Sequence, residues 1–241
     1  MAAAPLCSII IPVYREGRNI DTCLKALQRQ RRIGECEVIV ADGDGGSTLD
    51  AIARGEPALP PVELVTGRGR ARQMNTGAAA ARSDKLLFLH VDTFLPPRGL
   101  DLVIRTLESY DAGAFSLGVV DAGPLFNTWL AYVNGRKRFS FTPYGDQGLF
   151  MTAKVFRAVD GFPDLPLMED VVMTDRLKRG GFRLKLLHSR VLTSPRRWKR
   201  SGYILNFLKN TALYLLFRIG VSAQRLGRLY QPVPDKTSKN F

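Results

Sequence analysis

The chain has 241 residues, of which 45% are hydrophobic and 24% charged, an ordinary composition for a globular protein with a sizeable core. Its three cysteines form no C-x-x-C pair, which argues against a disulfide framework or a zinc site and favours a reducing cytoplasm. No basic region precedes the first apolar run, and Pro12 interrupts that run, so we expect no signal peptide.

The net charge of +13 is concentrated toward the C-terminus. Residues 1–175 hold 19 Lys and Arg against 21 Asp and Glu, whereas residues 176–241 hold 16 Lys and Arg against one acid. Such asymmetry indicates a polyanionic partner for the last quarter of the chain: nucleic acid, a membrane surface or phosphate groups.

Strand-like and helix-like patterns alternate along residues 7–110. Apolar runs predict strands at 7–14, 36–43, 61–67 and 85–92, and periodic patterns predict helices at 19–30, 47–55, 70–83 and 97–110. We expect the helix starts to be marked by Asn19 or Asp21, by Ser47 and by Pro97. This alternation is typical of an α/β fold with a mostly parallel sheet, in which ligands bind beyond the carboxyl ends of the strands.

Two of these strands end in polar side chains. Asp42 closes the strand in "CEVIVADG", and His90 and Asp92 close the strand in "LLFLHVDT". A turn residue or a satisfied core histidine is the structural alternative at these positions. The functional interpretation is one cleft, with a carboxylate that bonds a nucleoside and a second carboxylate that holds a metal.

Three arginines, Arg68, Arg70 and Arg72, surround the start of the helix at 70–83. Guanidinium groups at a helix N-terminus suit a diphosphate. A solvated basic face has the same sequence pattern, so this signal does not decide a function alone.

Glu169 and Asp170 begin an amphipathic helix within residues 166–181. Acids at a helix start are usually caps or partners of the helix dipole. The alternative is that one of them works as a general base in the same cleft.

The C-terminal region contains an apolar segment, residues 203–219, inside a stretch from 176 to 234 that has no acid. The segment is short for a transmembrane helix and contains Lys209, so the pattern favours an interfacial helix. The nearest flanking basic residues are Arg196, Arg197, Lys199, Arg200, Arg218, Arg225 and Arg228. A helix packed on the domain, or a contact in a homodimer, is the alternative.

A series of segments resembles the family 2 glycosyltransferases in order and in spacing. They are "SIIIPVYREGRNI", "VIVADGDGGSTLD", "GRGRARQMNTGAAAA", "LLFLHVDT" and the run from "GDQGLF" to "LKRGGF", and they span roughly residues 6–185. The "LHVDT" and "PLMED" variants are most similar to a small bacterial branch associated with arsenosugar-type biosynthesis.

The resemblance implies a GT-A fold, a Rossmann-like, mostly parallel sheet flanked by helices. It implies one catalytic domain over residues 1–190, with a nucleotide-binding half at about 1–115 and an acceptor-binding half at about 116–190. A basic, partly apolar helical segment would follow at 191–241. The implied reaction is an inverting transfer of a sugar from a nucleotide-diphosphate donor to an acceptor hydroxyl.

The resemblance also implies roles for individual residues. The nucleoside pocket would be lined by Pro12, Tyr14, Glu16 and Asp42, the last of which bonds the base. The acceptor wall would include Asp146 and Gln147 of "GDQG". In the matching E-D pair, Asp170 would be the catalytic base and Glu169 would orient the site or the acceptor.

Asp92 matches the last acid of the family's D-x-D metal motif. One carboxylate can suffice for Mg²⁺, because waters and phosphates fill the rest of its shell. His90 stands where many relatives have the first acid. As a ligand it would favour Mn²⁺ over Mg²⁺, and as a hydrogen-bond donor it would contact a phosphate. We therefore expect a divalent cation, Mg²⁺ or Mn²⁺, as the cofactor.

We predict a cytoplasmic, nucleotide-sugar-dependent glycosyltransferase whose residues 196–228 contact the inner face of the membrane peripherally. Its expected partners are the nucleotide-sugar donor and an unidentified acceptor. Two alternatives remain: a sugar-nucleotide-binding protein without turnover, and a nucleic-acid-binding protein that uses the basic tail. Against the second, we find no recognised RNA or DNA motif and expect no nucleic acid to bind.

Overall fold

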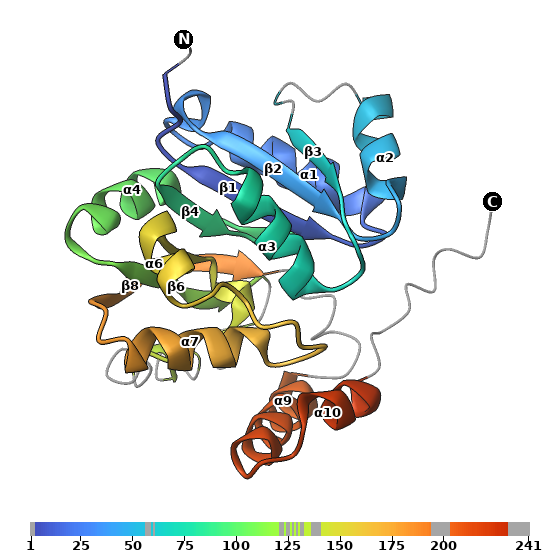
Figure 1. Cartoon of the computed structure of the whole chain (residues 1–241), viewed down its shortest axis with the longest axis vertical. Coiled ribbons are helices and arrows are strands. Elements are labelled where there is room, and N and C mark those ends of the chain that lie inside the picture. The colour runs from blue at the N-terminus through green and yellow to red at the C-terminus, as the bar shows by residue number, and fades with distance from the viewer. Residues whose placement is uncertain are drawn as a thin grey trace.

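The computed structural model describes residues 3–55, 61–120, 141–193 and 203–230, together with residues 59, 123, 126, 128, 130 and 133–135. Within them, helices cover both faces of an eight-stranded sheet with the order β3-β2-β1-β4-β7-β6-β8-β5 (Figure 1). The sheet joins strands from the first and the second half of the chain.

The first half of the sheet is parallel. It consists of β1 (Ser8–Val13), β2 (Glu37–Asp42), β3 (Val62–Val65) and β4 (Lys85–Phe88). Every residue of β1 and β2 is buried, as their continuous apolar runs predict. The strand expected at 61–67 is shorter and largely exposed, because it forms the edge of the sheet and pairs only with β2.

The second half of the sheet is mixed. It consists of β5 (Thr93–Phe94), β6 (Ala112–Val119), β7 (Leu149–Thr152) and β8 (Leu184–Thr193). Strand β7 runs antiparallel to both β4 and β6, whereas β6 and β8 are parallel. The predicted α/β fold with a mostly parallel sheet is therefore confirmed, with β5 and β7 as its antiparallel members.

Two apolar clusters hold the helices to the sheet. One face carries α1 (Gly17–Gln28), α2 (Ser47–Gly55) and α4 (Gly99–Ser109). The other face carries α3 (Arg70–Ala80), α6 (Ala153–Ala158) and α7 (Glu169–Arg179). Two short 3₁₀ helices, η1 (Ile33–Glu35) and η2 (Gly145–Gln147), precede β2 and β7. Asp170 thus lies on the same side of the sheet as the arginine-rich start of α3.

Three helix starts differ from the expected ones. Helix α1 begins with Glu16 at the N-cap, and Asn19 donates to the Glu16 carboxylate instead of capping the helix. Ser47 is the first residue of α2 instead of its N-cap. The Thr48 N–H in this first turn donates to the Asp42 carboxylate at 2.9 Å. Helix α4 begins after Arg98 rather than at Pro97, because Arg98 has a left-handed backbone with φ of 60°.

Helices α9 (Tyr203–Arg218) and α10 (Ala223–Leu229) form a hairpin against the start of α7 (Figure 1). Their Leu213 and Leu226 share an apolar cluster with Leu167, Met168 and Val171. The helix expected at 203–219 is therefore present and packs on the domain. The expected basic flank at residues 196–200 lies outside the described residues.

Candidate active site

Asp42 lies at the carboxyl end of β2 and is fully buried. Its two carboxylate oxygens accept the backbone N–H groups of Asp44 at 3.0 Å and Thr48 at 2.9 Å. Burial, together with the neighbouring carboxyl of Asp44, raises the pKa of Asp42. Thr48 also accepts the backbone N–H of Glu16 at 3.1 Å, so Asp42 and Glu16 are joined through one residue.

Tyr14 follows the end of β1, and the guanidinium groups of two arginines lie over its ring. Arg68 lies 5.0 Å and Arg15 lies 5.3 Å from the ring centroid. Pro12, two residues earlier, is buried in β1 and pairs with Ala41 in β2. The structure therefore brings Tyr14 and Arg68 together at the same edge of the sheet as Asp42.

The other two arginines at the start of α3 have separate partners. Arg70 Nε lies 2.8 Å from Glu169 Oε1, so it joins α3 to α7. Arg72 forms an exposed pair with Asp164 at 2.7 Å. Of the three arginines, Arg68 contacts Tyr14, and the other two bond carboxylates of the second half of the chain.

His90 and Asp92 lie in the tight turn between β4 and β5, in which the Thr93 N–H donates to the His90 carbonyl at 3.0 Å. Both side chains are half-buried. Burial raises the pKa of the Cys23 thiol in α1 to about 12, and the Asp92 carboxylate adds to that shift. Thr93 Oγ1 donates to the Asp146 carbonyl at 3.4 Å, which joins this turn to η2.

Gly145 is the point at which His90 and Asp170 meet. A Cβ atom placed on Gly145 would lie 3.3 Å from His90 Nε2 and 3.4 Å from Asp170 Oδ2. The Gly145 N–H donates to Asp170 Oδ2 at 2.6 Å, and the Val171 N–H donates to Asp170 Oδ1 at 2.8 Å. The half-buried Asp170 carboxylate is therefore oriented by two backbone donors beside the His90 imidazole.

Glu169 is almost completely buried, in contrast to Asp170. Its Oε1 pairs with Arg70, and its Oε2 is buried without a hydrogen-bond partner among the described residues. Burial raises the pKa of Glu169, against the lowering effect of Arg70. The two acids expected at this helix start are thus present, one oriented toward η2 and the other held to α3.

The segment 144–148 is held from inside by the Gln147 side chain. Gln147 is fully buried, donates to the Phe115 carbonyl at 2.7 Å and accepts the Tyr144 N–H at 3.0 Å. Gln147 therefore supports the turn from inside, whereas Asp146 is half-buried at its surface.

Tyr144 is a site residue that the sequence did not indicate. Burial raises the pKa of its phenol to about 12, and the Asp170 carboxylate and the Tyr214 hydroxyl add to the shift. Tyr214 comes from α9, far along the chain. Only its place in a strongly apolar segment was visible in the sequence, and that signal suggests packing rather than a site.

A protein-only metal centre is absent from the described part of the chain, since no three of its His, Cys, Asp and Glu side chains gather closely enough to hold an ion. The described residues also include no helix that is long and apolar enough to cross a membrane.

Comparison with known families decides the class of this arrangement. Residues 8–159 match the profile described as glycosyl transferase family 2. The chain belongs to glycosyl transferase family 2. This match covers β1 through α6 and includes Asp42 at the end of β2, His90 in the turn after β4, and Gly145 in η2.

Two relatives in Mycobacterium tuberculosis (strain CDC 1551 / Oshkosh) share parts of the sequence. An uncharacterized protein is 31% identical over 122 residues, 46% of this chain and 35% of its own length. An uncharacterized glycosyltransferase is 33% identical over 111 residues, 45% of this chain and 41% of its own length. The aligned part is thus less than half of each of these curated relatives.

Solved structures share the fold at low sequence identity. The mannosyltransferase PcManGT from Pyrobaculum calidifontis, in complex with GDP-Man and Mn²⁺, has a TM-score of 0.64 and 18% identity, over 97% of this chain and 67% of that one. Residues 1–349 of S. aureus TarS, in complex with UDP, have a TM-score of 0.60 and 18% identity, over 78% of this chain and 60% of that one. These likenesses support the GT-A type of fold for the present chain.

Proposed function

We propose that this chain is an inverting glycosyltransferase that moves a sugar from a nucleotide-diphosphate donor to an acceptor hydroxyl. The observation that carries the proposal is the meeting of His90, Gly145 and Asp170 beyond the strand ends of a family 2 fold. Ligands of open α/β sheets bind at such strand ends. A sugar-nucleotide-binding protein without turnover would not need a carboxylate oriented by two backbone donors.

The donor site in this proposal is the edge that carries Asp42, Glu16 and Tyr14. Tyr14 and Arg68 would enclose the nucleoside, and Pro12 would form the floor beneath it. Arg68 is exposed beside the start of α3, where a guanidinium and helix N–H groups would stabilise a diphosphate. Two of the structural neighbours were solved with GDP-Man and with UDP, which supports a nucleotide sugar as the donor.

Asp170 is the proposed base. Its carboxylate would take the proton of the acceptor hydroxyl as that oxygen attacks the anomeric carbon, because a neutral hydroxyl is a weak nucleophile. The bonds from Gly145 and Val171 hold the carboxylate in place. Glu169 would act on position only, since its pairing with Arg70 joins α7 to α3.

A divalent cation fits the donor set at the strand end. Asp92 supplies a carboxylate and His90 an imidazole, both half-buried, and this combination suits Mn²⁺ at least as well as Mg²⁺. When bound, the cation would neutralise the charge that develops on the leaving diphosphate. The Mn²⁺ in the mannosyltransferase structure supports a metal of this class.

Three finer predictions belong to this proposal. The "LHVDT" and "PLMED" segments suggest the branch associated with arsenosugar-type biosynthesis. The chain would divide into a catalytic domain at 1–190 and a C-terminal segment at 191–241. That segment would contact the inner membrane face, since α9 exposes Leu205, Leu208 and Leu215 by 64%, 55% and 56%.

Nucleotide binding with and without metal tests the proposal. In a thermal-shift assay in Mn²⁺, a panel of UDP- and GDP-sugars should include one that stabilises the wild-type protein. At a hundred times its dissociation constant, this ligand should raise the free energy of unfolding by about 2.7 kcal/mol. The Asp92→Asn variant should lose most of this stabilisation in Mn²⁺ and little in EDTA. Equal losses in the two buffers would exclude a metal role for Asp92, and no response to any nucleotide sugar would exclude the function.

A further inference from the structure

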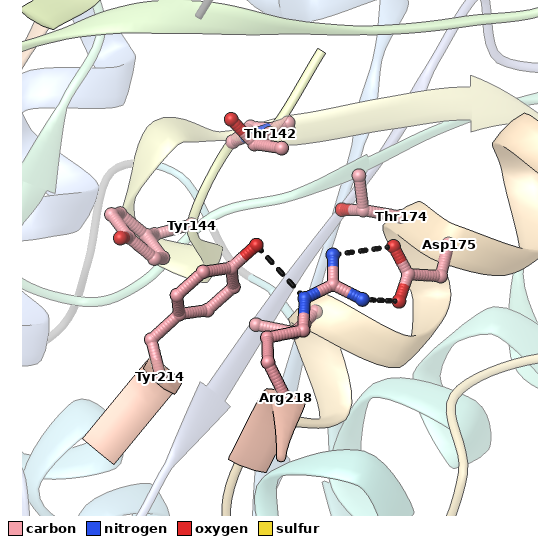
Figure 2. Close-up of a pocket in the computed structure, with 8 residues that line it drawn as sticks. Thr142, Tyr144, Thr174, Asp175, Tyr214 and Arg218 are labelled. Carbon is pink, nitrogen blue, oxygen red and sulfur yellow. Dashed lines mark hydrogen bonds and ion pairs between the residues drawn. The ribbon is translucent and has the colours of Figure 1, made fainter. Parts of the chain in front are cut away.

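A cavity of about 90 Å³ lies between α7, α9 and the segment before η2. Figure 2 shows six of the side chains that line it, from three separate parts of the chain: Thr142, Tyr144, Thr174, Asp175, Tyr214 and Arg218. Helix α9 closes the cavity on the side of Tyr214 and Arg218. The C-terminal hairpin is therefore a wall of this cavity as well as a packing partner of α7.

The cavity is lined by residues that adjoin the supports of the proposed base. Tyr144 lines it, and the N–H of the next residue, Gly145, donates to Asp170 Oδ2 at 2.6 Å. Thr174, one turn after Asp170 on α7, lines the cavity and donates its hydroxyl to the Asp170 carbonyl at 2.8 Å. The carboxylate and the cavity thus share the same two supporting segments.

The charged groups of the cavity neutralise each other. Arg218 bonds both oxygens of Asp175, at 2.6 and 3.1 Å, and donates its Nε hydrogen to the Tyr214 hydroxyl at 2.9 Å. Figure 2 shows the guanidinium between these two partners. A bidentate pair of this kind holds its geometry well, so the lining is fixed and locally neutral.

The remaining lining combines hydroxyl groups with aromatic faces. The Thr142 hydroxyl can both donate and accept, whereas the Thr174 hydroxyl donates to the Asp170 carbonyl and can still accept. Tyr144 and Tyr214 lie next to each other (Figure 2). A few polar groups on an otherwise apolar wall are typical of small-ligand sites. Such a lining suits a neutral molecule with many hydroxyls, whereas an anion would compete with Asp175 for Arg218.

We infer that this cavity is the acceptor subsite and takes a neutral polyhydroxylated acceptor, a sugar or a polyol. The inference rests on the proposed function, because Tyr144 and Val171 line the cavity next to Gly145 and Asp170, and an acceptor held there would extend its hydroxyl toward the proposed base. Ligand pockets usually measure roughly 300–1,000 Å³, so a cavity of about 90 Å³ holds one end of the acceptor. Helix α9 is then part of the acceptor site, and Tyr214 and Arg218 determine specificity.

Acceptor kinetics on the full chain test this inference. The probes are glycerol, myo-inositol, methyl α-mannoside, methyl β-glucoside and glycerol 3-phosphate, each with the nucleotide sugar that gives the largest thermal shift. The readout is release of the nucleoside diphosphate above the rate with water alone. The variants are Tyr214→Phe, which removes one hydroxyl, and Arg218→Lys, which keeps the charge but loses the two-point hydrogen bonding to Asp175. The matched control is Arg105→Lys, an exposed position on α4.

At least one neutral probe should accelerate release by the wild-type protein. Arg218→Lys should raise the KM for that probe at least about tenfold, the effect of losing one charged hydrogen bond, and Tyr214→Phe should raise it about three- to tenfold, the effect of losing a neutral one. Both variants should leave the donor KM and the hydrolysis by water unchanged. Arg105→Lys should match the wild type. Melting curves show whether each variant is folded, and Tyr214→Phe retains the ring that packs in α9.

Three results would overturn the inference. One is an unchanged acceptor KM in both folded variants, and a second is donor hydrolysis that no neutral probe accelerates. The third is tighter use of glycerol 3-phosphate than of glycerol by about tenfold or more, which would assign the cavity to anions. Absence of both donor binding and donor hydrolysis in the wild type would instead contradict the glycosyltransferase assignment itself, and this inference with it.

Discussion

Gly145 shows how much of the candidate site depends on a single missing side chain. An ordinary methyl group there would approach the His90 ring to 3.3 Å and the Asp170 carboxylate to 3.4 Å. Contacts of this length are accommodated when neighbouring groups move by a few tenths of an ångström. Both neighbours belong to the proposed catalytic arrangement, so the cost of the movement falls on activity more than on folding.

We therefore expect Gly145→Ala to melt close to the wild type and to lose about tenfold in kcat, because a displacement near 1 Å costs on the order of a hundredfold. The control is Gly34→Ala, whose added methyl meets nothing within 4 Å. Steady-state donor turnover and a melting curve measure the two effects. Full turnover by Gly145→Ala would show that the spacing between His90 and Asp170 is irrelevant.

The sequence indicated some residues of the candidate site and not others. Asp170 and His90 were recognisable because each lies in a motif with a characteristic local context. Tyr144 and Tyr214 were not, because their proximity arises from the packing of α9 on α7, and no local pattern encodes it. The arginines at 68–72 lie in between: their common ligand was predicted, whereas their separate partners, Tyr14, Glu169 and Asp164, required the fold.

Among the secondary-structure elements, the pairing of α3 with α7 is the tie between the two halves of the site. Arg70 is 38% exposed and Glu169 is 3% exposed at the side-chain level. Removal of one partner from a buried pair destabilises strongly, because the other charge stays buried and unpaired. The exposed part of Arg70 reduces this effect.

Arg70→Ala should lower the free energy of unfolding by about 2–3 kcal/mol, somewhat less than the loss for a fully buried pair. Glu169→Gln should cost about 1 kcal/mol, and the double variant should be less unstable than the sum of the two by at least about 1 kcal/mol. Denaturant titrations measure these values. If the losses of stability were additive, and Arg70→Ala also selectively lost nucleotide affinity, Arg70 would be assigned to the diphosphate site instead.

The residues at which helices begin were predicted least accurately from the sequence, for a physical reason. Capping preferences favour short polar side chains, and Asn19, Asp21 and Ser47 fit that rule. The observed N-caps of α4 and α7 are Arg98 and Met168, both with left-handed backbone. Tertiary packing imposes such conformations at a cost in strain, so local propensity does not reveal them.

At the C-terminal side of the molecule, the α9–α10 hairpin has one apolar face that packs on the domain and another that is exposed. Leu213 and Leu226 are buried against α7, whereas Leu205, Leu208, Leu215 and Ile219 are exposed. The sequence predicted an apolar helix and left packing and membrane contact as alternatives. The structure shows that one face packs, because α7 offers a matching apolar surface, and the exposed leucines remain available for the proposed membrane contact.

Vesicle co-sedimentation tests that contact on the full chain. The protein should pellet with vesicles that contain phosphatidylserine and less with phosphatidylcholine alone, since each basic residue near an anionic surface contributes about 1 kcal/mol. Leu215→Gln combined with Ile219→Gln should remove the part of the binding that resists salt, without a change in melting. A wild-type protein that stays in solution with both vesicles would contradict the membrane proposal.

Asp170→Asn tests most directly whether Asp170 is the base of the proposed glycosyl transfer. The amide keeps one acceptor for the two backbone N–H groups and should cost about 1 kcal/mol in stability. It cannot take a proton at neutral pH. We predict unchanged donor affinity and a turnover at least about 100-fold lower. The control Asp21→Asn, which changes an exposed side chain on α1, should equal the wild type. Turnover within about threefold of the wild type, in a less stable Asp170→Asn protein, would show that Asp170 only supports the start of its helix.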